Sequence, residues 1–103
     1  MFTETKIVPT LLNGATGTAY YRKNISGNLE ICGNITIGTG TAPVALFIMI
    51  AGYRPANPAN IRAYNNNTGG FVDLVVAVDG GVALRTSVTT GNVISFSAVL
   101  ALA

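Results

Sequence analysis

Short runs of apolar residues alternate with clusters of Gly, Asn and Thr along the whole chain. No window carries the i, i+3, i+4, i+7 apolar spacing of an amphipathic helix. The apolar runs are rich in Val, Ile, Tyr and Phe, which suit a pleated, half-buried surface. Turn clusters recur at the spacing of about 8–12 residues that is typical of a sandwich or barrel. The pattern therefore predicts an all-β domain of about eight antiparallel strands, without helices.

The alternation is clearest over residues 29–38. Its odd positions, from Leu29 to Ile37, are apolar or Gly, and its even positions, from Glu30 to Thr36, are mostly polar. One face of this strand is therefore expected in the core and the other at solvent or an interface. The continuous apolar run Val44–Ile50 is expected to be covered on both faces. We expect strands at residues 7–12, 19–23, 29–38, 44–50, 61–64, 71–78, 82–86 and 93–102.

The turn signals between these strands differ in strength. Asp79-Gly80 lies between two alternating apolar runs, which is the strongest short-range signal for a β-hairpin. The run Asn65–Gly70 predicts a loop, because Asn and Gly tolerate left-handed backbone. Pro9 is consistent with an edge position for the first expected strand.

Composition adds a constraint on what surrounds this domain. Half of the 103 residues are hydrophobic and 10% are charged, whereas about 25% are charged in typical soluble domains. The longest apolar run, Val44–Ala51, is shorter than the ~20 residues of a membrane-spanning helix, so we expect no membrane insertion. Copies of the same chain are the preferred cover for the excess apolar surface.

Several classes of chemistry lack the residues that they need. The chain has no His and one Cys, Cys32, so neither an internal disulfide nor a Cys–His nucleophile or metal site can form. The net charge of +2 is too small for a nucleic-acid-binding face. We therefore expect no cofactor, no metal and no nucleic-acid partner.

Enzymatic hydrolysis of a polysaccharide is a weak alternative. It would require two carboxylates across a cleft, and Glu30 and Asp73 are the remaining pair once Glu4 is assigned to the N-terminal lead-in and Asp79 to a turn. Both lie in the middle of expected strands without a supporting motif. We therefore expect no enzyme.

Carbohydrate binding requires less: planar hydrogen-bonding groups beside an aromatic face. The second half of the chain supplies both. The alternative is that the Asn run is only a flexible loop and that the tyrosines only cap the core. The candidate saccharide-binding residues are Tyr53, Arg54, Arg62, Tyr64, Asn66, Asp73 and Arg85.

Five motifs follow one another in a specific order. They are a turn at Leu11–Gly17, a Tyr-Arg-Lys strand ending at Lys23, the strand Leu29–Thr36, the corner Gly52-Tyr53-Arg54-Pro55, and the Asp-Gly hairpin. In this order they resemble the head or tip domain of receptor-binding proteins in bacteriophage tail fibres or baseplates of the siphophage type. Ala15 stands where that family commonly has Trp.

The resemblance implies a β-sandwich or jelly-roll-like barrel that forms a homotrimer. It implies a single head domain over residues 1–103, with residues 1–10 as a lead-in from a stem or N-terminal arm. Such a head sits at the tail tip of the virion, contacts other tail or baseplate proteins and binds host cell-wall polysaccharide without chemistry.

Two alternatives accompany this resemblance. The domain could be a structural assembly or trimerisation module without a ligand. The Gly-Tyr-Arg-Pro motif could be a structural corner, in which Tyr53 packs, Arg54 pairs and Pro55 sets the bend. Convergence of Arg54, Arg62, Tyr64 and Asp73 in one open groove would favour binding over a purely structural role.

Overall fold

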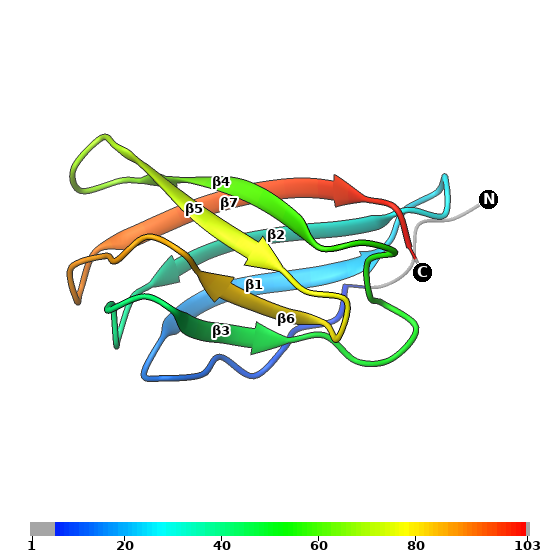
Figure 1. Cartoon of the computed structure of the whole chain (residues 1–103), viewed down its shortest axis with the longest axis horizontal. Helices are drawn as coiled ribbons and strands as arrows, with labels where there is room; N and C mark the ends of the chain where they lie inside the picture. Colours follow the sequence, from blue (N-terminus) through cyan, green and yellow to red (C-terminus); the bar gives the residue numbers. More distant parts are fainter. Residues whose placement is uncertain (1–5, 103) are drawn as a thin grey trace.

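The computed structural model describes residues 6–102, which form one curled antiparallel sheet (Figure 1). Within this range no helix is long and apolar enough to cross a membrane. The strands are β1 (Thr16–Lys23), β2 (Leu29–Thr36), β3 (Val44–Ile48), β4 (Ala59–Asn65), β5 (Phe71–Val76), β6 (Gly81–Leu84) and β7 (Val93–Leu100). Their order in the sheet is β1-β2-β7-β4-β5-β6-β3.

The all-β, antiparallel prediction is confirmed, but the described residues contain seven strands rather than about eight. The prediction of a strand at residues 7–12 is wrong. That segment makes one isolated bridge, between Ile7 and Tyr21, and then crosses to the far edge of the sheet. Pro9 lacks the N–H that a continuous ladder needs. Residues 1–5 of the expected lead-in lie outside the described residues.

The N-terminal segment connects the two outer strands of the sheet. Ile7 exchanges backbone hydrogen bonds of 2.9 and 3.0 Å with Tyr21 of β1. Further on, the Leu12 N–H donates to the Leu46 carbonyl of β3 at 2.8 Å, and the Asn13 side-chain amide donates to the Ala45 carbonyl at 2.8 Å. Figure 1 shows this blue segment running alongside β3. The segment therefore bridges the opening of a half-barrel.

Tyr21 makes a second connection across the same opening. Its side chain is 1% exposed, and its hydroxyl accepts a hydrogen bond from the Ile50 N–H just after β3, at 3.1 Å. A buried Tyr is favourable when its apolar ring packs in the core and its hydroxyl forms a hydrogen bond. Strand β1 is thus tied to the end of β3 from inside the half-barrel.

Two aromatic rings fill the middle of the core. Phe96 of β7 lies opposite Gly33 of β2, and its ring occupies the space where a Cβ on Gly33 would point, 2.5 Å from the ring tip. The same ring stacks on Phe47 of β3 at a centroid distance of 6.5 Å. Gly33 therefore makes room for the contact that joins the β2–β7 side of the sheet to β3.

The expectation that residues 44–50 are covered on both faces is wrong. A β-bulge between Ala45 and Phe47 shifts the alternation, so that Leu46 and Phe47 are both buried. Beyond the bulge, Ile48 and Ile50 point outward and are 56% and 55% exposed. An extra residue in one strand turns the following side chains to the opposite face.

The predicted Asp-Gly hairpin is confirmed, and β5 pairs with β6. Its strands are shorter than expected, because the turn includes Ala77 and Val78, and Gly80 adopts a φ of 91°. The clean alternation of residues 29–38 is confirmed, with Leu29, Ile31, Ile35 and Ile37 buried. Compared with expectation, β1 begins earlier, at Thr16, β4 begins at Ala59, and β7 ends at Leu100.

The Gly33–Phe96 contact leads to a test of the core. We expect Gly33→Ala to lower the free energy of unfolding by about 1–3 kcal/mol, because the added methyl meets the Phe96 ring in a packed core. Chemical denaturation measures the change. Gly70→Ala is the matched control, since its Cβ would meet nothing closer than 3.5 Å.

Adding Phe96→Leu to Gly33→Ala should give a smaller loss than the sum of the two single changes, because both residues compete for one space. If the losses of unfolding free energy are additive, the Phe96 ring does not restrict the size of the side chain at position 33.

Candidate functional site

Four of the predicted binding residues gather on one exposed face. Arg62 and Tyr64 lie on β4, Asp73 lies on β5, and Arg85 follows β6. Arg62 is directly opposite Asp73, and Tyr64 is directly opposite Phe71. The Arg85 N–H donates to the Asp73 carbonyl at 2.8 Å. The residues between them face the core, so alternation along the strands turns all of these side chains outward.

Asn60 also belongs to this face. It lines a polar depression of about 350 Å³ together with Asp73 and Arg85. Arg85 Nη1 donates a long hydrogen bond of 3.4 Å to Asn60 Oδ1. We call this surface the β4–β6 outer face; it comprises Asn60, Arg62, Tyr64, Phe71, Asp73 and Arg85.

The Asp73 carboxylate lies between two arginines without an ion pair to either. On one side of Asp73 lies Arg62 of the adjacent strand β4, and on the other side lies Arg85, which follows the adjacent strand β6. By contrast, Arg22 and Glu30 on β1 and β2 form an ion pair at 3.0 Å. Both guanidiniums and the carboxylate therefore remain open to a ligand.

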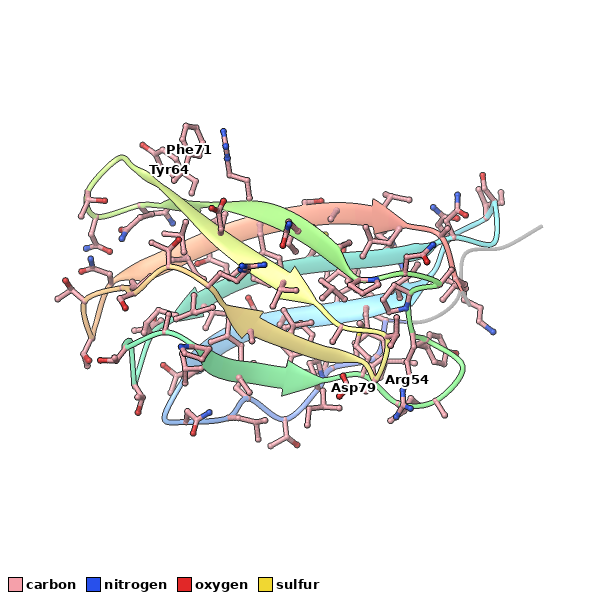
Figure 2. All side chains as sticks on the ribbon, viewed as in Figure 1. Arg54, Tyr64, Phe71 and Asp79 are labelled. Carbon is pink, nitrogen blue, oxygen red and sulfur yellow. The ribbon has the colours of Figure 1, made fainter. Side chains whose placement is uncertain are left out.

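An aromatic pair stands at one end of this face. The rings of Tyr64 and Phe71 meet edge to face at 6.1 Å, and their side chains are 45% and 65% exposed. The Arg62 guanidinium lies 5.1 Å from the centre of the Phe71 ring. Figure 2 shows both rings projecting from the β4–β5 end of the molecule. Exposed rings beside planar hydrogen-bonding groups suit a ligand with apolar and polar sides.

Phe71 was not among the predicted site residues. Its signal was its position two residues before Asp73, which places the two side chains on the same face of a strand. Asn60 stands two residues before Arg62 in the same way. Alternation along the strands would therefore have added Phe71 and Asn60 to the predicted site residues.

Asn66 lies at the end of the same face, in the loop between β4 and β5. Its side-chain amide donates to Ser95 Oγ at 3.0 Å. The neighbouring Asn65 is buried, and its Oδ1 accepts from the N–H groups of Asn67 and Thr68. Asn67 Oδ1 accepts from the Val93 N–H at 2.8 Å. The Asn side chains therefore fold this loop and tie it to β7.

Tyr53 and Arg54 lie apart from the other candidates. The Tyr53 ring packs edge to face on Tyr21 at 5.6 Å, and Arg54 Nε donates to the Met49 carbonyl at 3.4 Å. Pro55 is buried and bridges to Leu102. In Figure 2, Arg54 lies near Asp79, toward the opposite end of the long axis from Tyr64 and Phe71. Gly-Tyr-Arg-Pro has the geometry of a structural corner.

A second polar cluster covers the outer side of β1, β2 and β7. Glu30 pairs with Arg22 at 3.0 Å and accepts a hydrogen bond from the Tyr20 hydroxyl at 3.2 Å. Cys32 Sγ lies 3.3 Å from Ser97 Oγ. The pKa of Tyr20 is raised to about 12, first by its contact with the Cys32 side chain and then by partial removal from water and by Glu30. These polar groups are mutually engaged.

Glu30 and Asp73 do not meet across a cleft. Strands β7 and β4 lie between their strands, which corresponds to about 14 Å at the usual strand spacing. Paired carboxylates of glycosidases stand roughly 5–9.5 Å apart. Over residues 6–102, no group of three or more metal-ligating side chains gathers either. The chemistry that the β4–β6 outer face offers is hydrogen bonding, charge and ring contact.

Comparison with protein families, curated proteins and solved structures found no match to this chain.

The Tyr20 environment predicts a measurable pH dependence. Its phenol should ionise near pH 12 in the folded protein, against about 10 in the unfolded chain. A raised native pKa means that the associated stability is present below pH 10 and is lost as the pH rises toward 12. Subtracting the ultraviolet titration of Tyr20→Phe from that of the unmodified protein isolates this group.

Cys32→Ala should move that difference titration toward pH 10, because it removes the largest cause of the shift. A Tyr20 component that already titrates near 10 in the unmodified protein would contradict the described contact.

Proposed function

We propose that this chain is the head domain of a bacteriophage tail-fibre or baseplate receptor-binding protein. In this proposal it binds host cell-surface saccharide without catalysis, through the β4–β6 outer face. The observation that supports it most is the gathering of Arg62, Tyr64, Asp73 and Arg85 on one exposed surface. Asn66 borders that surface, whereas Tyr53 and Arg54 do not take part.

The chemistry of this face suits a sugar ring. A sugar presents hydroxyls at its rim, and these pair with fixed planar donors and acceptors such as Arg, Asn and carboxylate groups. Its C–H face packs against an exposed aromatic ring. Asn60, Asp73 and Arg85 would hold the hydroxyls in the polar depression, while Phe71 and Tyr64 would cover the ring of an adjoining unit.

The wider setting follows from the order of the sequence motifs. The curled sheet would serve as the sandwich or jelly-roll-like barrel of a homotrimeric head at the tail tip. Other tail or baseplate proteins would be its neighbours in the virion. The structural role of Gly52–Pro55 agrees with a motif that maintains such a head while the ligand binds elsewhere.

The second candidate function is a structural or trimerisation module without a ligand. One observation favours it: Val8, Ile48 and Ile50 are 75%, 56% and 55% exposed. They line a groove between the N-terminal segment and β3 whose lining carries no charged side chain. Exposed apolar surface of this kind is typical of an interface between proteins, and copies of this uncharged surface that meet around a three-fold axis would cover one another without burying a charge.

A glycan-binding series tests the proposed site. After a host cell-wall glycan panel has identified a ligand, Arg85→Ala and Asp73→Asn should each weaken binding by about tenfold or more. Each hydrogen bond to a charged group contributes roughly 1.5–3 kcal/mol. Titration calorimetry measures the change.

Arg22→Ala and Asp79→Asn are the matched controls, because these residues lie away from the β4–β6 outer face and should leave affinity unchanged. Equal losses in controls and site variants, or no ligand on the panel, would count against the proposal.

The oligomeric state tests the assembly part of both candidates. Light scattering behind a sizing column should give a mass near three times the 10.6 kDa of one chain. Ile48→Glu should lower that mass toward one chain, because it places a charge in the apolar groove.

Val99→Glu is the matched control, since Val99 is also 56% exposed but lies on β7. If the unmodified protein is a monomer in solution, the homotrimer assumed in both candidate functions is wrong.

A further inference from the structure

The β4–β6 outer face carries an unbalanced positive charge. Arg62 and Arg85 flank the single carboxylate of Asp73, which leaves one positive charge on this surface. The other carboxylates in the described residues are engaged elsewhere. Glu30 pairs with Arg22 on the opposite part of the sheet, and Asp79 accepts from the Gly81 N–H in its own turn. A ligand with one negative charge would balance this face.

The two guanidiniums have unused hydrogen-bond donors. Arg85 makes one long side-chain hydrogen bond, to Asn60 at 3.4 Å. Arg62 contacts the Phe71 ring at 5.1 Å, a contact to the π-system that leaves N–H groups available. The guanidinium fork matches the geometry of a carboxylate or a phosphate. Both side chains are exposed, so a bound anion would reach them directly from solvent.

Asp73 limits which anion fits. Its carboxylate lines the same depression as Arg85 and Asn60, and an ionised carboxylate can only accept hydrogen bonds. It therefore suits a sugar hydroxyl and repels a second negative charge. A ligand with a singly charged group beside a hydroxyl provides hydrogen-bond partners for Asn60, Asp73 and Arg85. A doubly charged phosphomonoester would instead place its second negative charge against Asp73.

We infer that the β4–β6 outer face selects saccharides that carry one negative charge per recognised unit, as a carboxylate or a phosphodiester. The anion binds to the Arg85 guanidinium in the polar depression, a neighbouring hydroxyl donates to Asp73, and the sugar ring lies toward Arg62 and Phe71. This inference depends on the proposed saccharide-binding function and adds the class of ligand to it.

The test compares ligands that carry different charged groups. Oligogalacturonate and its methyl ester share one ring and linkage, and the ester removes the carboxylate charge. A glycerol-phosphate oligomer supplies the phosphodiester, and a hexose 6-phosphate supplies the phosphomonoester. Calorimetry on the full chain at low salt should show at least about tenfold tighter binding of oligogalacturonate than of its ester, or of the glycerol-phosphate oligomer than of the hexose 6-phosphate. The preference should weaken as added salt screens exposed charges.

Variants separate charge selectivity from binding itself. Arg85→Gln should abolish the preference for the charged ligand, while Arg22→Gln, on the opposite part of the sheet, should retain it. Asp73→Asn should improve relative binding of the hexose 6-phosphate, because it removes the repelling carboxylate. Circular dichroism of each variant confirms that it is folded.

Each outcome has one meaning. Preference for the oligogalacturonate alone identifies a carboxylate ligand, and preference for the glycerol-phosphate oligomer alone identifies a phosphodiester. Equal binding of acid and ester, both weakened by Arg85→Gln, would overturn the charge selectivity and leave the proposed function standing. Binding of none of these ligands, nor of any neutral cell-wall glycan, would overturn both.

Discussion

Closure of a curled sheet across its two outer strands is the constraint on which the rest of this structure depends. A seven-stranded sheet that stayed open would leave the apolar side chains of β1 and β3 in water and two backbone edges unpaired. The N-terminal segment prevents this by pairing with Tyr21 at one end and Leu46 at the other. The Tyr21 hydroxyl completes the connection at Ile50.

Closure also determines where polar chemistry can be placed. Once one face of each strand is directed inward, around the Phe47 and Phe96 rings, every second side chain must face solvent. On β4 and β5 these positions bring Arg62 opposite Asp73 and Tyr64 opposite Phe71. On β1 and β2 they bring Arg22 opposite Glu30, where the charges pair. The same alternation thus yields one face whose polar groups are mutually engaged and one that is open.

The β4–β6 outer face and the apolar groove beside the N-terminal segment have different chemistry. The β4–β6 outer face is polar, with charged and aromatic groups, whereas the groove beside Val8, Ile48 and Ile50 is lined without charge. A ligand-binding surface and a self-association surface can therefore coexist on this chain without competing for the same residues. Three of the ten charged residues of the chain, Arg62, Asp73 and Arg85, stand on the β4–β6 outer face.

Alternation and turn chemistry in the sequence were enough to determine the all-β class, most strands and the Asp-Gly hairpin, because these depend on neighbours in the chain. They could not show that residues 7–12 bridge two distant strands, since the partners of Ile7 and Leu12 lie far along the sequence. They could not reveal the bulge that exposes Ile48 either, because a bulge is defined by its partner strand. Only the tertiary structure separated Tyr53 and Arg54 from the other candidates. That separation depends on packing against Tyr21 and Met49, and local pattern carries no information about such contacts.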